Sequence, residues 1–137
     1  MNSLLAPVLA LVVLSLIVWV WMYATRIPAM QRAGLQPQEL RFPASLQQLP
    51  ATARQVADNY NHLMEQPTIF YALVFYIVLA GHSDQIHVYL AWAYVALRVV
   101  HTLVQGSVNI VAMRFSIFTL STLALMVMAG REVVALL

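Results

Sequence analysis

The stretch that decides the fold is Arg54–Tyr71, RQVADNYNHLMEQPTIFY. Its polar residues are spaced by three or four positions, as on two adjacent faces of a helix: Arg54, Asp58, Asn61 and Glu65 in one stripe, and Gln55, Asn59, His62 and Gln66 in the other. From Ile69 the sequence becomes IFYALVFYIVLAG, an apolar run without a charge. The stretch therefore predicts a helix whose first half is polar and whose second half enters a membrane.

The composition of the whole chain also indicates a membrane protein. The 137 residues are enough for one domain, residues 1–137, and 62% are hydrophobic while only 9% are charged. Soluble domains have roughly a quarter of their residues charged. The formal net charge is +2 and no basic cluster forms, which argues against nucleic acid as a partner. The chain has no cysteine, so disulfides, thiolate metal sites and a cysteine nucleophile are excluded.

Outward from the central stretch, the apolar runs predict four membrane-spanning helices, at about 4–25, 51–80, 86–105 and 111–129. The first run lacks the basic start and the small-residue cleavage site of a signal peptide, so we expect it to stay in the protein. Residues 26–50 contain four prolines and predict a loop with little regular structure. Pro67 should kink the second helix. The predicted fold class is an all-α membrane protein with a four-transmembrane-helix bundle.

Arginine placement predicts the orientation in the membrane. The first and third loops would lie on one side, and most arginines are at or near it: Arg26, Arg32, Arg41, Arg54 and Arg114. On the other side only Arg131 is found. The positive-inside rule then places these two loops in the cytoplasm and both termini outside.

Polar residues inside the predicted spans mark a candidate site. Arg98, His101 and Gln105 share one face of the third helix, and Arg114 begins the fourth on the cytoplasmic side. A charge at membrane depth costs about 2.5–3.5 kcal/mol, so such groups face an interior or a cavity. Excess arginine there favours an anionic ligand, since guanidinium groups bind carboxylates. The scattered histidines, with arginines around them, argue against a metal site.

Two other interpretations of this cluster stay open. It can be structural, with Glu65 and Arg98 as a buried ion pair, in a non-catalytic protein whose cluster binds lipid headgroups or stabilises an oligomer. It can also belong to a small transporter or a proton relay through His62, Glu65 and His101, although fixed arginines disfavour the passage of cations.

Two segments resemble the MAPEG family, the membrane-associated proteins in eicosanoid and glutathione metabolism. They are RQVADNYNHLMEQPTIFYALVF (54–75) and AWAYVALRVVHTLVQGSVNIVAMRF (91–115). The family's second helix has an arginine, then an asparagine and a glutamate three residues apart, then a proline. Its third helix carries an Arg-x-x-His motif. The resemblance covers about residues 26–118. The chain looks like the small bacterial branch of the family, which implies a bacterial inner membrane, and the orientation from the arginines would then place the termini in the periplasm.

The resemblance implies a homotrimer that binds glutathione between subunits near the cytoplasmic side and joins it to an apolar small-molecule substrate. Arg54 and Glu65 match the second-helix ligands, and Arg26 is a candidate for a first-helix arginine in the same site. Arg98 and His101 match the third-helix motif. Arg114 matches the arginine that activates the glutathione thiolate in some members, which makes it the candidate catalytic residue.

The chain departs from the family pattern at two positions. His62 stands three residues before Glu65, where catalytic members have asparagine, and Asn59 and Asn61 flank it. Gln105 stands four residues after His101, where several members have a tyrosine near the thiol. An amide lacks the acidity of a phenol, so thiolate stabilisation would depend on Arg114. The sequence thus predicts binding of glutathione or a similar anionic thiol and leaves open whether the chain is an enzyme.

Overall fold

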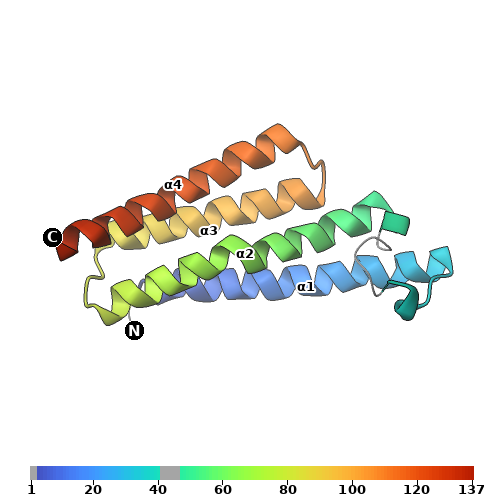
Figure 1. The fold of residues 1–137 in the computed structure, drawn as a ribbon, viewed down its shortest axis with the longest axis horizontal. Coiled ribbons are helices and arrows are strands. Elements are labelled where there is room, and N and C mark those ends of the chain that lie inside the picture. The colour runs from blue at the N-terminus through green and yellow to red at the C-terminus, as the bar shows by residue number, and fades with distance from the viewer. Residues whose placement is uncertain (1–2, 41–46) are drawn as a thin grey trace.

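The computed structural model describes residues 3–40 and 47–137, and within them four long helices lie along the molecule (Figure 1). The helices are α1 (Leu5–Ala33), α2 (Ala51–Leu79), α3 (Gln85–Gly106) and α4 (Val111–Leu136), and a short 3-10 helix, η1 (Pro37–Leu40), follows α1. Each long helix has the length and apolar composition needed to cross a membrane. The predicted all-α bundle of four spans is confirmed.

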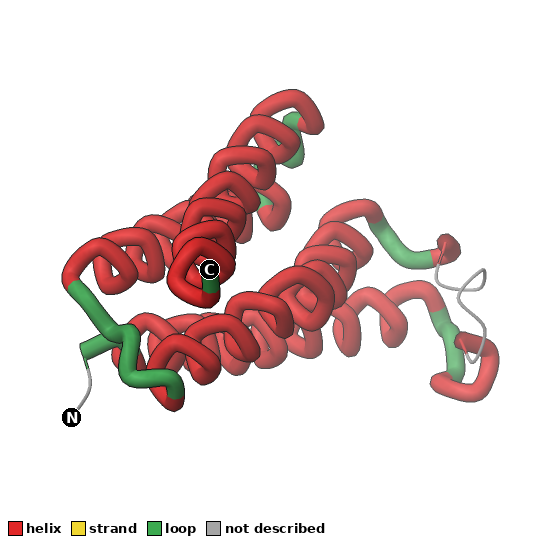
Figure 2. Tube along the Cα trace, turned by 60° about the vertical axis from the view of Figure 1, so that its left-hand side comes forward, coloured by secondary structure: helices red, strands yellow, loops and turns green. Residues whose placement is uncertain are grey.

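The connections lie at the two ends of the bundle (Figure 2). One end holds both termini and the turn between α2 and α3, and we call it the termini end. The other holds the connection from α1 to α2 and the α3–α4 turn, and we call it the first-loop end. Arg41, which the charge argument counts at the first-loop end, lies outside the described residues.

The prediction that residues 26–50 form a loop from its first residue is wrong, because α1 continues to Ala33. Pro28 lies inside the helix without ending it. Ala29 and Met30 are buried against Leu49 and Ala53, so packing on the start of α2 stabilises the added turns. The helix ends where Gly34 takes a left-handed conformation with φ 69°, a conformation that costs glycine little.

The bounds of α2 and α3 follow the apolar pattern closely. α2 begins directly after Pro50 and runs through Pro67, and the ranges of α2 and α3 agree with the predicted ones to within one residue at each end. α4 is longer than predicted, because it continues past residue 129 to Leu136. Its last turns are held by Glu132, which is buried and contacts His82 and His87 at the termini end.

The core lies between all four helices and is centred on stacked rings. Phe70 of α2 and Tyr94 of α3 have ring centroids 4.6 Å apart, and both are fully buried with Leu63, Leu125 and other apolar residues. Lipid tails are as apolar as leucine, so the hydrophobic effect does not drive helices together inside a membrane. Close packing and interhelical hydrogen bonds hold such a bundle together instead.

One side chain supplies two of those hydrogen bonds. Gln66 of α2 donates from Nε2 to the Thr122 hydroxyl of α4 at 2.8 Å and accepts from the Tyr94 hydroxyl of α3 at 3.2 Å. Three helices are therefore tied at the middle of the bundle, where α2 changes from polar to apolar.

Candidate functional site

The polar first half of α2 borders three adjoining hollows with volumes of about 300, 310 and 240 Å³. The first lies between α2, α3 and α4, and we call it the α2–α4 cleft; its lining consists of polar groups and three apolar side chains: His62, Glu65, Gln66, His101, Val111, Arg114, Phe115 and Phe118. The second hollow shares His62, Glu65 and Arg114 with the cleft.

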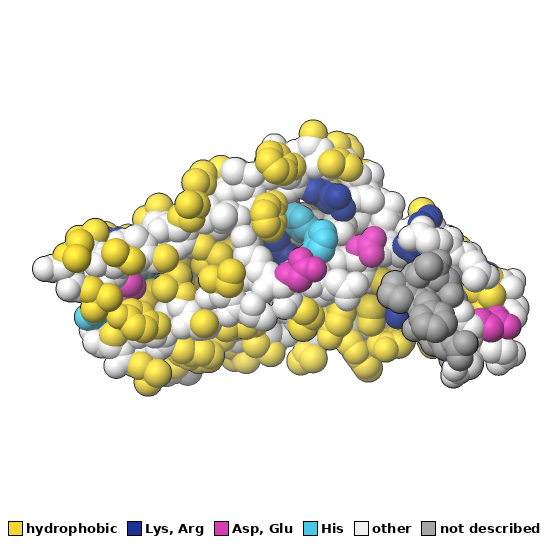
Figure 3. Space-filling model, in the orientation of Figure 1, with side chains coloured by type: hydrophobic (Ala, Val, Ile, Leu, Met, Phe, Trp, Pro, Cys, Tyr) yellow, Lys and Arg dark blue, Asp and Glu magenta, His cyan; other side chains and the backbone are white. Residues whose placement is uncertain are grey.

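The third hollow adjoins the second through Asp58 and Asn61 and reaches Arg26 on α1. The three hollows share lining residues along α2, and we call them together the α2 groove. Figure 3 shows histidine, acidic and basic side chains gathered in a hollow in the middle of this face, between apolar surfaces. The stripe spacing explains this position, since side chains three or four residues apart on α2 project to the same side.

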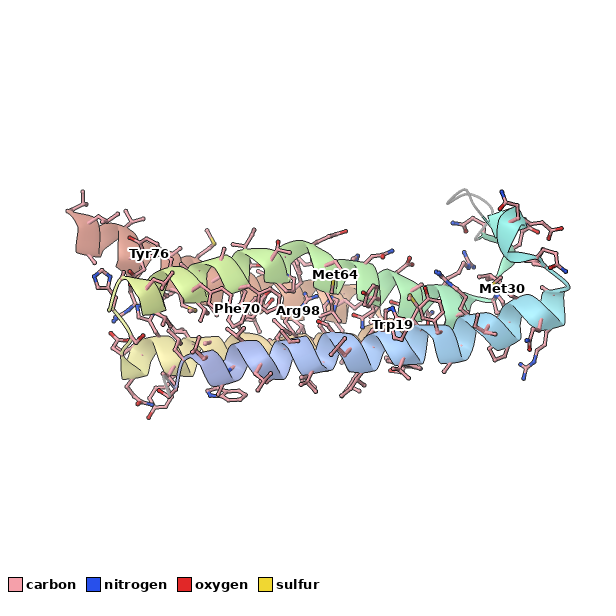
Figure 4. The ribbon with its side chains drawn as sticks, turned by 90° about the horizontal axis from the view of Figure 1, so that it is seen from below. Trp19, Met30, Met64, Phe70, Tyr76 and Arg98 are labelled. Atoms are coloured by element: carbon pink, nitrogen blue, oxygen red, sulfur yellow. The ribbon has the colours of Figure 1, made fainter. Side chains whose placement is uncertain are left out.

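Eight of the ten predicted site residues line the α2 groove: Arg26, Arg54, Asn61, His62, Glu65, His101, Gln105 and Arg114. The other two, Asn59 and Arg98, lie beneath it in the bundle interior, fully or almost fully buried. Asn59 accepts a hydrogen bond from the Thr102 hydroxyl at 3.4 Å, which links α2 to α3. Figure 4 shows Arg98 between the helices, between the levels of Phe70 and Met64.

Five residues that line the first two hollows were not among the predicted site residues: Asp58, Gln66, Val111, Phe115 and Phe118. The sequence carries a signal for four of them. Asp58 and Gln66 belong to the two polar stripes of α2. Phe115 follows Arg114 directly, and Phe118 lies four positions after it, on the same face of α4.

Most of the predicted site residues have a buried polar atom that makes no hydrogen bond. Among the described residues, buried nitrogen or oxygen atoms that make no hydrogen bond belong to nine side chains, seven of them predicted site residues: Arg26, Arg54, Asn59, Arg98, His101, Gln105 and Arg114. In Arg98, which is only 1% exposed, all three guanidinium nitrogens are unpaired. Such groups are expensive inside a protein, and their concentration at one place indicates a functional site.

The acidic residues of the groove do not neutralise its arginines by direct pairing. Within residues 3–40 and 47–137, neither Asp58 nor Glu65 has an arginine nitrogen within the 4.0 Å of an ion pair. Arg54 instead donates to the side-chain oxygen of Gln47 at 2.6 Å. A buried Glu65–Arg98 ion pair is therefore absent from the described residues, and the arginines can receive an anion.

The described ion pairs lie at the termini end of the bundle. Glu132 of α4 contacts Nδ1 of His82 at 2.6 Å and Nε2 of His87 at 3.0 Å, and Arg131 pairs with Asp84. The carboxylate of Asp84 caps α3 by accepting the backbone N–H of His87 at 2.8 Å. That bond, aided by the nearby charges of His87 and Arg131, lowers the pKa of Asp84 from its usual value.

The residues of the α2 groove can bind an elongated anion with one apolar end. Arg26, Arg54 and Arg114 supply fixed positive charge along it, and arginine can bind a carboxylate with two parallel hydrogen bonds. Val111 and Phe115 give the α2–α4 cleft an apolar wall next to Arg114. No group of three histidine or acidic side chains in the described parts of the chain is arranged to hold a metal ion.

Comparison with known proteins identifies the family. The sequence matches the MAPEG family over residues 4–134, nearly its whole length. Searches of curated proteins and of solved structures gave no match. Together with the four apolar helices, the family match makes this an integral membrane protein whose helices contact lipid. The chain belongs to the MAPEG family.

Proposed function

We propose that the α2 groove binds glutathione or a similar anionic thiol, and that the protein joins the thiol to apolar electrophiles. The observation that carries this proposal is the set of unpaired arginine nitrogens around the groove. Glutathione has two carboxylates, one ammonium group and one thiol. Its carboxylates suit Arg26 and Arg54 at one end of the groove, and the acidic Asp58, which lines the same hollow, suits the ammonium group.

Arg114 is the proposed catalytic residue at the other end. It lines both the α2–α4 cleft and the second hollow, which we call the polar hollow because all its lining side chains are polar. A thiol bound near Arg114 would therefore face the apolar wall of Phe115 and Phe118. A guanidinium group beside a thiol favours the thiolate, which lowers the thiol pKa from about 8.5. An apolar electrophile entering from the bilayer would meet the thiolate at this wall. Gln105 carries an amide, which lacks the acidity of a phenol, so stabilisation of the thiolate depends on Arg114.

The proposed assembly is a homotrimer in which a neighbouring subunit covers the groove. The support is the position of the groove on the outer surface of the protomer, with its polar residues flanked by apolar ones (Figure 3). We also propose that the first-loop end faces the cytoplasm of a bacterial inner membrane, with the termini in the periplasm. The support is the arginine excess at that end.

Calorimetry on the purified protein in detergent tests the binding step directly. We expect glutathione to bind with micromolar to millimolar affinity, and an analogue in which the thiol is replaced by a methyl group to bind comparably, because the carboxylates supply most of the contacts. A conjugation assay with an aryl chloride then tests turnover. No heat of binding at millimolar glutathione would refute the proposal.

The second candidate is a non-catalytic protein whose arginines bind lipid phosphate. A competition experiment by calorimetry distinguishes this candidate from the first one. Titration with a short-chain anionic phospholipid should displace bound glutathione if the groove is a headgroup site, and should leave its affinity unchanged if the groove selects the thiol tripeptide.

A further inference from the structure

His62 occupies a particular position in the α2 groove. It lines both the α2–α4 cleft and the polar hollow, and its side chain is partly exposed. The centroid of its ring lies 6.1 Å from that of His101 on α3. His62 is therefore an imidazole that both the polar and the apolar part of the groove can reach.

Charged and titratable groups approach His62 from three helices. On α2 itself, Glu65 lies one turn after it and Asp58 one turn before it, and both line the polar hollow with it. Arg114 approaches from α4, and His101 from α3 with Arg98 beneath it. Carboxylates therefore approach His62 from its own helix, and guanidinium groups approach it from the other two helices.

The groove has few groups that can accept a proton near neutral pH. Arginine stays protonated, and an ionised carboxylate such as Glu65 is a weak base. Histidine is the side chain whose ordinary charge change falls between about pH 5 and pH 8. Of the two imidazoles, His101 is buried and is near both Arg98 and Arg114. A proton on His101 would add a third positive charge there, whereas a proton on His62 would face Glu65.

We infer that His62 is a catalytic base that takes the proton from the thiol bound in the α2 groove. This inference rests on the proposed function and adds a residue to it. The S–H bond breaks, its electron pair stays on sulfur, and the proton moves to a ring nitrogen of His62. Arg114 faces the resulting thiolate, and Glu65 faces the imidazolium. When the sulfur displaces a halide from an aryl chloride, the halide leaves with its bonding electron pair and His62 passes its proton to water.

The first test is the pH dependence of conjugation in His62→Gln and His62→Asn. Neither amide can accept a proton near neutral pH, and both keep a polar side chain in the groove. We expect the conjugation rate near pH 7 to fall about 100-fold, which is a typical effect of losing a general base. The loss should shrink towards higher pH, where the thiol ionises without help. His82→Gln, which changes a histidine at the termini end, is the matched control and should keep the wild-type profile.

The second test uses binding alone and the wild-type protein. Calorimetry near pH 7 in two buffers with different ionisation heats reports the protons released when glutathione binds. If His62 keeps the thiol proton, the wild-type protein should release almost none, and His62→Gln should release more for each thiolate formed. Release of about one proton by the wild-type protein contradicts the inference, even when a variant fails to fold.

The outcomes separate the inference from the proposed function. Glutathione binding and conjugation with an unchanged pH profile in His62→Gln would overturn the role of His62 and leave the proposed function standing. A wild-type protein that does not bind glutathione would overturn both. A loss of conjugation in His62→Gln that is equal at every pH would indicate a structural role for His62 and would also overturn the inference.

Discussion

Gln66 of α2, which lines the α2–α4 cleft, donates a hydrogen bond to Thr122 on α4 at 2.8 Å. The Thr122 hydroxyl in turn donates to the carbonyl of Phe118 at 2.9 Å. The side chain of Gln66 therefore holds α4 beside α2 at the place where the cleft meets the apolar core.

Replacing Gln66 with alanine should lower the thermal midpoint of the protein. The change leaves the Tyr94 hydroxyl without its acceptor, and loss of hydrogen bonds at buried groups costs about 1–3 kcal/mol. Thermal unfolding in detergent measures the effect. Gln55→Ala on the same helix is the control, because Gln55 makes no side-chain hydrogen bond to the described residues. An equal midpoint for both variants would mean that the Gln66 network contributes nothing to stability.

Replacing Arg98 with methionine should have opposite effects on stability and on binding. Its three guanidinium nitrogens are buried and unpaired, and burial of a charge without a partner is costly, so an apolar side chain of similar length should remove that cost. We expect a higher thermal midpoint and at least a tenfold loss of glutathione affinity by calorimetry. A structural arginine that holds subunits together would give the reverse result, a lower midpoint with unchanged affinity.

Replacing Arg114 with alanine should affect the rate of conjugation and not the assembly. Removal of one charge-stabilising donor typically lowers kcat by about 100-fold or more. Arg114 is partly exposed at the groove, so its loss leaves no large cavity in the core. Conjugation kinetics and size-exclusion chromatography with light scattering measure the two properties. Arg114→Lys should recover only part of the rate, because lysine lacks the planar fork. Dissociation of the oligomer in Arg114→Ala would favour a structural role.

The sequence predicted the helices well where local pattern decides them. Long apolar runs marked the spans, and the polar stripes of α2 correctly grouped Arg54, Asn61 and Glu65 on the groove. The predicted end of α1 is too early because the four prolines of residues 26–50 together indicate a loop, and Pro28 is the first of them. Whether a proline ends a helix depends on what packs beyond it, and the burial of Met30 against Leu49 involves residues from two elements.

Residue depth and long-range contacts could not be predicted from the sequence. Arg98 and Arg114 are both arginines in apolar helices, yet one is buried beneath the groove and the other lines it. Their difference depends on how α3 and α4 rotate against α2, which no single helix determines. The contact between His82 and Glu132 joins residues 50 positions apart, and neither side chain belongs to a recognisable motif.

Asp84 gives a prediction for the pH dependence of stability. Its folded-state pKa is lowered, first of all because it accepts the His87 backbone N–H as the cap of α3. A carboxyl group with a lowered pKa contributes stability above its unfolded pKa of about 3.9, and that contribution is lost as the pH falls through the folded pKa. Unfolding free energies of wild type and Asp84→Ala should therefore differ by about 1 kcal/mol near pH 7, an ordinary value for a cap.

Asp84→Asn separates the cap from the charge. Asparagine still accepts the His87 N–H, so the variant should keep most of the stability near pH 7 and show no acid-dependent step from this position. It also loses the ion pair with Arg131, which is partly exposed and contributes little. Denaturant unfolding between about pH 3 and pH 7 tests both statements. A difference between wild type and Asp84→Ala that grows as the pH falls would contradict the sign, because protonation of Asp84 can only remove its contribution.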